Sequence, residues 1–160
     1  MIVVVNSTPL IYLAAIGRFD LLQAIYGRIV IPAAVYEEVV TQGAGKPGAS
    51  ETAEATWIER RDVADRSNLA SLAGALHGGE SEVVILAGEL RADLVIMDEQ
   101  AGRGELARRG LSFVGTIAVL TEGKRRGLVR TLRPELDRLR NCGFHLSDRV
   151  FRDCLAAVGE

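Results

Sequence analysis

Short apolar runs rich in β-branched residues, separated by helix signals, constrain the fold of this chain more than any other feature. Four of these runs are predicted strands, at residues 2–5, 29–31, 94–97 and 112–114. Continuous apolar runs of this length are typical of strands that are buried on both faces of a parallel sheet. Strands that alternate with helices therefore predict an α/β fold in which helices cover both sides of the sheet.

Helix signals occupy most of the chain between and after these runs. The first helix has Ser7 or Thr8 as its cap and Pro9 in its first turn, and it ends at Gly17. Further helices are predicted at residues 19–26, from residue 32 onward, and at 80–90, 100–109, 116–126, 134–141 and 147–158. Weaker patterns predict a helical turn at 51–56, an edge strand at 57–63, a helix at 68–76 and a flexible glycine-rich loop at 42–50.

Length and composition favour one domain that spans residues 1–160. A chain of this length with 48% hydrophobic residues can bury a core without disulfides, and its two cysteines lack zinc-site spacing. No apolar run approaches the ~20 residues of a membrane span, and the N-terminus lacks a signal-peptide pattern, so we expect a soluble cytoplasmic protein. The 19 basic and 21 acidic residues give a net charge of -2, so any contact with nucleic acid must be local.

Polar side chains cluster where the predicted strands end. In open parallel sheets, ligands bind beyond the carboxyl ends of the strands, at the point where the strand order reverses. Asn6 and Ser7 follow the first strand, and Asp98 and Glu99 follow the third core strand. Three further acids lie on the predicted helices beside them: Glu38, Glu80 and Glu82. Oxygen ligands without imidazole or thiolate favour Mg²⁺ or Mn²⁺, and a cation would offset the repulsion between the carboxylates.

Each of these residues also has an interpretation without function. Glu38 fits the solvated face of an amphipathic helix, and Asp98 fits the N-cap of the helix that follows it. The basic residues Lys124, Arg125 and Arg126 stand at a helix end, where they either interact with the helix dipole or contact an RNA phosphate.

Two other patterns carry no function. The run GAGKPG lacks the glycine spacing of a phosphate-binding loop and has Pro47 where serine or threonine should follow the lysine. His77 and His145 are far apart in sequence and have no metal-ligand spacing, so neither is a candidate general base.

Several segments, taken in order, resemble the PIN domain family, in particular a prokaryotic branch similar to VapC-type toxin ribonucleases. The resemblance covers nearly the whole chain and rests on VVVNSTPLIYLAAIGRFDLL, VIPAAVYEEVV, HGGESEVVILAGEL, LVIMDEQAGRGELARRGLSFVGTIAVLTEGKRRGLV and NCGFHLSDRVFRDCLAAVGE. It implies a three-layer αβα fold around a parallel sheet of about five strands. It also implies Mg²⁺- or Mn²⁺-dependent cleavage of RNA, a homodimer and, in toxin members, neutralisation by a small antitoxin protein.

The resemblance also assigns site residues. The first acidic position of the family falls on Asn6, the second on Glu38, the third on Glu82 with Glu80 as competitor, and the fourth on Asp98 with Glu99 as competitor. It implies metal ligation by Asp98 and Glu82, with Glu38 holding a second ion or orienting water. Asn6 departs from the family pattern because an amide oxygen can accept a cation but carries no charge.

Three functions follow from these observations. The leading hypothesis is a metal-dependent endoribonuclease that acts as the toxin of a toxin-antitoxin pair. The second is a PIN-like binding or regulatory module that is weak or silent in catalysis because Asn6 replaces the first acidic ligand. The third is a small-molecule phosphohydrolase, for which the chain offers no nucleophile motif.

Overall fold

The computed structural model describes residues 1–160 and contains one five-stranded sheet in which all strands run parallel. The strand order is β3-β2-β1-β4-β5. The strands are β1 (Val3–Val5), β2 (Ile29–Pro32), β3 (Ile58–Arg61), β4 (Leu94–Ile96) and β5 (Phe113–Val114). The predicted α/β class, the parallel sheet and the number of strands are therefore confirmed.

Ten α-helices and one π-helix connect and follow the strands. Those before β4 are α1 (Ser7–Ala15), α2 (Asp20–Tyr26), α3 (Ala33–Tyr36), the π-helix η1 (Glu37–Gln42), α4 (Ala49–Glu54), α5 (Arg66–Leu72) and α6 (Gly78–Leu90). Those after β4 are α7 (Gln100–Arg108), α8 (Thr116–Arg125), α9 (Leu132–Asn141) and α10 (Asp148–Ala157). No helix in the structure is long and apolar enough to span a membrane.

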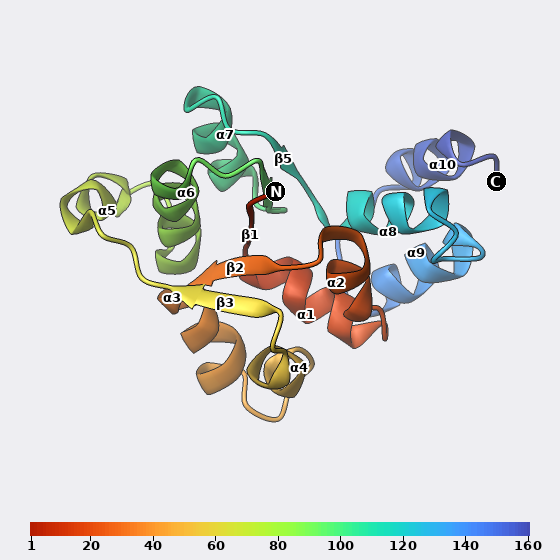
Figure 1. The fold of residues 1–160 in the computed structure, drawn as a ribbon. Helices are drawn as coiled ribbons and strands as arrows, with labels where there is room; N and C mark the ends of the chain where they lie inside the picture. The colour runs from red at the N-terminus through yellow and green to blue at the C-terminus, as the bar shows by residue number, and fades with distance from the viewer.

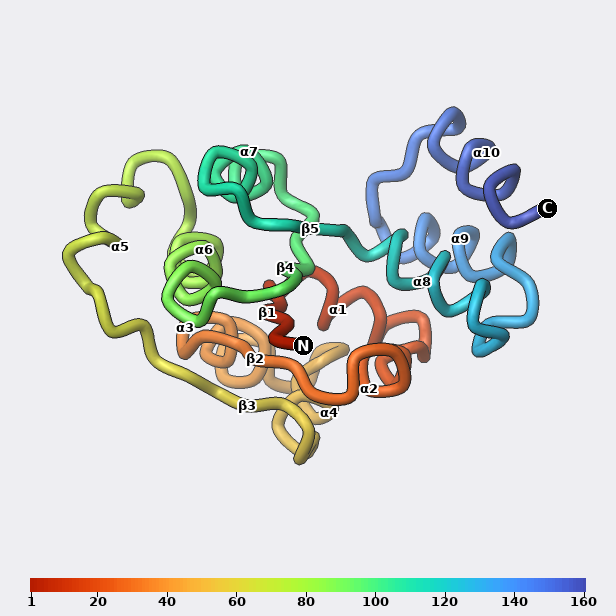
Figure 2. The backbone as a smooth tube through the Cα atoms, turned by 45° about the horizontal axis from the view of Figure 1, so that its top comes forward, coloured from red at the N-terminus to blue at the C-terminus, as the bar shows by residue number.

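The helices form a layer on each side of the sheet. In Figure 1, α6 and α7 lie on one side, while α1, α2 and α8 lie on the other, and α9 and α10 extend the second layer toward the C-terminus. The tube view in Figure 2 gives the same separation. α6 contacts β1 and β2, whereas α8 contacts α1 and α2 across the opposite layer.

The strand order reverses between β1 and β4. From β1 the chain moves outward to β2 and then β3, whereas from β4 it moves the other way to β5. β1 and β4 are hydrogen-bonded neighbours, with Val5 opposite Ile96. Their carboxyl ends therefore meet at the topological switch point, where parallel sheets bind ligands.

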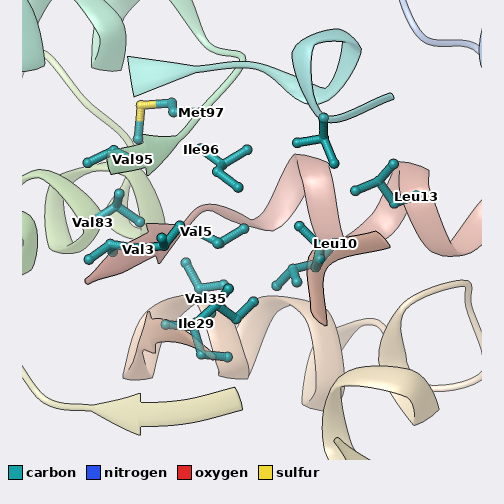
Figure 3. Close-up of a cluster of buried hydrophobic side chains, with 14 of the residues drawn as sticks. Val3, Val5, Leu10, Leu13, Ile29, Val35, Val83, Val95, Ile96 and Met97 are labelled. Atoms are coloured by element: carbon teal, nitrogen blue, oxygen red, sulfur yellow. The ribbon is translucent and has the colours of Figure 1, made fainter. Parts of the chain in front are cut away.

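The core lies between the sheet and both helix layers. The three residues of β1 are fully buried, as their continuous valine run predicts. Figure 3 shows side chains from β1, β2 and β4 packed with Leu10 and Leu13 of α1, Val35 of α3 and Val83 of α6. This packing holds the first residue after β1 and the first residues after β4 next to each other.

The predicted edge strand at 57–63 is β3, at the edge of the sheet. The predicted helix at 68–76 is α5, which begins and ends earlier. The flexible loop predicted at 42–50 is wrong at both ends, because η1 includes Gln42 and α4 begins at Ala49. Glycine-rich composition lowered the helix signal there, but the helix ends are held by tertiary contacts between α4, η1 and α1.

Candidate active site

Asn6 stands at the switch point and begins the site. It follows β1 directly, and its backbone N–H donates to the carbonyl oxygen of Ile96 at the end of β4, at 3.0 Å. Its side chain is 3% exposed. A buried amide must find hydrogen-bond partners, so the groups around Asn6 define what the site contains.

Glu99 is the partner of the Asn6 amide. Asn6 Nδ2 donates to Glu99 Oε2 at 2.9 Å, and the hydroxyl of Thr8 donates to Glu99 Oε1. Two neutral donors thus hold a carboxylate in place without neutralising it. Because the Asn6 amide nitrogen donates to Glu99, Asn6 Oδ1 is left to face the other side of the site.

Glu38 lies on that other side. Ser7 Oγ donates to Glu38 Oε2 at 2.7 Å. Gly79, at the start of α6, lies beside Glu38 and Asn6. A Cβ at this position would lie 3.0 Å from Glu38 Oε2 and 3.8 Å from Asn6 Oδ1. The glycine therefore leaves open the space onto which the amide oxygen and the second carboxylate face.

Glu80 joins the group from the first turn of α6. Its carboxylate accepts from the backbone N–H of His77 at 3.3 Å, which is the arrangement of a capping glutamate at the third position of a helix. Burial raises the pKa of Glu80, and the nearby charges of Glu99 and Glu38 raise it further. Asn6, Glu38, Glu80 and Glu99 thus form one group, called here the carboxylate cluster.

Glu82 does not belong to the carboxylate cluster, although the sequence argument preferred it to Glu80 as the third acidic position. It lies on another face of α6, where burial raises its pKa and the charges of Arg66 and Arg60 lower it. One of its oxygens, Oε1, is buried without a hydrogen-bond partner. Residues two apart on a helix point in different directions, and the sequence pattern around Glu82 did not reveal which direction faces the sheet edge.

Asp98 adjoins the carboxylate cluster and is held by Thr116. The backbone N–H of Thr116 donates to Asp98 Oδ1 at 2.9 Å, and its hydroxyl donates to Asp98 Oδ2 at 2.6 Å. Asp98 therefore caps α8, not the following helix α7 as the alternative interpretation held. Burial raises the pKa of Asp98, the two Thr116 hydrogen bonds oppose that rise, and the charge of Glu99 adds to it.

The donor chemistry of the cluster fits a hard divalent cation. Its ligand atoms are all oxygens, and none of Glu38, Glu80 and Glu99 forms an ion pair. Like-charged carboxylates that lack a counterion favour a cation between them. The side chains are not spaced as in a metal-bound centre, because no three carboxylate, imidazole or thiolate groups are close enough together to hold an ion.

Comparison with known proteins identifies the family. The model of a family described as a PIN domain matches residues 2–160. The chain belongs to the PIN domain family. The predicted resemblance is thereby confirmed. No curated protein matches the chain.

A solved structure has the same fold as this PIN domain. It is a PilT N-terminus domain protein from the hyperthermophilic archaeon Sulfolobus solfataricus P2, with a TM-score of 0.52 and 17% sequence identity. The match covers 76% of this chain and 92% of the archaeal chain. At this identity the likeness supports the fold alone.

Two site residues were missed by the sequence argument, although the signal for one of them was present. Thr116 follows β5 after a single glycine, so the rule that selected Asn6 and Asp98 at strand ends also applies to it. Thr8 was considered only as a helix cap, and no sequence pattern predicts its contact with Glu99 across 91 residues.

Proposed function

We propose that this PIN domain is a metal-dependent endoribonuclease that hydrolyses RNA phosphodiesters. The observation that carries the proposal is the carboxylate cluster at the switch point, where Glu38, Glu80 and Glu99 surround Asn6 without any cationic side chain paired to them. In the reaction, water adds to phosphorus and the bond to the 3′ oxygen breaks. The 3′ oxygen takes a proton, so the products are a 5′-phosphate and a 3′-hydroxyl.

Glu38, Glu80 and Glu99, together with Asn6 Oδ1, are the residues that would hold Mg²⁺ or Mn²⁺. When bound, such an ion supplies positive charge to the phosphodiester as negative charge develops on it. The protein supplies orientation. Ser7 holds Glu38, Thr8 and the Asn6 amide hold Glu99, and the His77 N–H holds Glu80. Such supporting contacts fix the rotamers that a metal site requires.

Asn6 is better explained as a partner of Glu99 than as a defective aspartate. An aspartate at position 6 would place a carboxylate against the carboxylate of Glu99, whereas the amide donates a hydrogen bond to it. Glu99 then supplies the negative charge that position 6 lacks. This pairing supports an active site over the silent module that the sequence also suggested.

Cleavage of single-stranded RNA by the purified protein tests the proposal, with Glu80→Gln and Glu82→Gln as a matched pair. We expect cleavage with Mg²⁺ or Mn²⁺ that EDTA abolishes, a loss of about 100-fold or more for Glu80→Gln, and little change for Glu82→Gln. The two variants make the same chemical change two residues apart on α6, so the difference reports on the carboxylate cluster. Equal activity of Glu80→Gln and wild type would contradict the assignment.

The silent module has one specific observation in its favour, the absence of three acidic groups already spaced for an ion. Titration calorimetry separates the two functions. The nuclease proposal expects Mn²⁺ to bind the wild type and to bind Glu80→Gln more weakly. A wild type that binds no divalent ion at millimolar concentration and leaves RNA intact would favour the binding module.

The family resemblance supports two protein partners as part of the same proposal, namely a second copy of this chain and a small antitoxin. The first is tested by sedimentation velocity, where a homodimer has twice the 17.2 kDa mass of one chain. A protein that stays at the mass of one chain at high micromolar concentration would contradict the dimer.

A further inference from the structure

A pocket of about 420 Å³ adjoins the carboxylate cluster at Asp98 and lies between α8 and α10. Its volume falls within the ~300–1,000 Å³ of small-ligand sites. Figures 1 and 2 show that α8 and α10 occupy the same side of the molecule, near the C-terminus. None of the residues proposed to hold the metal lines this pocket, which reaches the carboxylate cluster only through the neighbouring Asp98.

Two arginines of the pocket form no ion pair, although the charge of Arg103 acts on the neighbouring Asp98 carboxylate. Arg103 and Arg125 both line it, and neither forms an ion pair. Arg125 is exposed, whereas Arg103 is half-buried and is held by its Nε, which donates to the Met97 carbonyl at 2.7 Å. In a chain with net charge -2, two unpaired guanidinium groups beside one pocket form a local site for an anion.

Gly115 makes room for the Arg103 guanidinium. A Cβ at this position would lie 2.3 Å from Arg103 Nη2 and 2.6 Å from Asp98 Oδ1, closer than atoms can approach. The backbone at the end of β5 therefore brings a guanidinium group and the Asp98 carboxylate to the same place. A ligand phosphate on Arg103 would lie directly beside the carboxylate cluster.

The remaining wall of the pocket is apolar. Ile117 and Ala118 of α8 face Val150 and Cys154 of α10. Val150 is 41% exposed and is one of four large hydrophobic residues of the chain that are exposed. Burial raises the pKa of the Cys154 thiol, which keeps it neutral and suited to an apolar surface.

We propose that this pocket holds one nucleotide of a single-stranded RNA, with its phosphate on Arg103 and Arg125 and its base against Ile117, Val150 and Cys154. The inference rests on the proposed nuclease function and assigns the nucleotide subsite next to the cleaved bond. A nucleotide combines an anionic phosphate, a sugar and a base whose flat faces are apolar, and the pocket presents a matching surface to the phosphate and to a face of the base. It also assigns a substrate role to Arg125, beyond its interaction with the helix dipole.

Binding of fluorescein-labelled RNA octamers in EDTA tests the subsite without catalysis. The probes are oligo(U), oligo(A) and oligo(C), and the variants are Arg125→Gln and Val150→Asp, both at exposed positions that leave the core intact. We expect each variant to weaken binding by roughly 3- to 10-fold. Arg125→Gln should also lower the slope of log affinity against log salt by about 0.7, the value for one phosphate contact on a single strand.

Two controls make the same changes away from the pocket. Arg152→Gln removes an exposed, unpaired arginine from α10, and Ala156→Asp adds a carboxylate to the α10 face opposite Val150 and Cys154. We expect both controls to bind like the wild type. Equal losses in the pocket variants and the controls would overturn the subsite, as would a wild type that does not bind the octamers.

Cleavage assays separate failure of the subsite from failure of the proposed function. If the wild type cuts RNA with Mn²⁺ while Arg125→Gln and Val150→Asp bind and cut like it, the subsite is wrong and the nuclease stands. If the wild type neither binds nor cuts RNA, both proposals fail. Preferential binding of an acidic peptide, with no binding of RNA, would also overturn the subsite.

Discussion

Two buried acidic residues in this protein, Glu80 of the carboxylate cluster and Glu135 of α9, have opposite electrostatic surroundings. Around Glu80, burial and the charges of Glu99 and Glu38 raise the pKa, and together they outweigh the lowering by the backbone N–H and the charge of His77. On α9, Glu135 is held between two guanidinium groups: Arg18 at 2.5 Å from Oε1 and Arg138 at 2.5 Å from Oε2. Burial alone would raise the pKa of Glu135, but the hydrogen bonds and charges of the two arginines outweigh it and lower the pKa.

The difference separates a structural acid from one that favours a cation. Glu135 pairs with Arg18, in the turn between α1 and α2, and with Arg138 of α9, so its charge is balanced within the protein and no ligand is required. The carboxylates of the carboxylate cluster instead form no ion pair, and His77 only partly opposes the rise in the pKa of Glu80. Burial therefore does not distinguish Glu80 from Glu135, whereas the charge of their partners does.

The largest stability effect is expected on the structural side of this comparison. Glu135→Gln leaves Arg18 without its buried carboxylate partner and should lower the free energy of unfolding by about 2–3 kcal/mol. This loss is smaller than for a fully buried ion pair, because both arginines keep contact with water. At 160 residues this lowers Tm by roughly 5–10 °C in a thermal melt. The control is Glu105→Gln, because Glu105 pairs with two arginines of its own helix, Arg108 and Arg109, and should lose less than about 1 kcal/mol. Equal losses of stability in Glu135→Gln and Glu105→Gln would contradict the structural role of Glu135.

The wild type and Glu135→Gln should also differ in how their stability depends on pH. A glutamate whose pKa is lowered in the folded state stabilises the fold above its unfolded pKa of about 4.3, and this contribution is lost as pH falls through the folded pKa. The stability difference between wild type and Glu135→Gln should therefore be constant at neutral pH and shrink below about pH 4. Urea melts from pH 3 to 7 measure it. A difference that grows toward low pH would contradict the assigned sign.

The smallest expected change in stability concerns the carboxylate cluster. Asn6→Asp adds a carboxylate against Glu99 and should lower the stability of the metal-free protein by about 1 kcal/mol. Millimolar Mn²⁺ should reverse the loss, since a bound cation stabilises the folded state by mass action. The double variant with Glu99→Gln restores a donor facing an acceptor and should match the wild type in EDTA. If Asn6→Asp is as stable as wild type without metal, the pairing of Asn6 with Glu99 is not what holds the site.

Much of the site could be predicted because strand ends are visible in the sequence. The valine run before Asn6 and the apolar run before Asp98 identify two neighbouring carboxyl ends, and the structure joins them through the hydrogen bond between Asn6 and Ile96. Glu38 was assigned by resemblance, and its contact with Ser7 brings it to the same edge. The preference for Glu82 over Glu80 had no support from the helix faces, because a sequence pattern does not show which face of α6 points to the sheet edge.

By itself, the sequence determined the α/β class, the parallel sheet, the family and the region of the chain that carries the acids. These follow from local patterns, in which burial on both faces requires continuous apolar strands and each helix requires its own period and caps. Only the tertiary structure decided that Glu99 pairs with Asn6, that Glu80 rather than Glu82 faces the cluster, and that Asp98 caps α8. Those contacts join residues from separate elements, so they depend on how helices rotate and pack against the sheet, which no local pattern encodes.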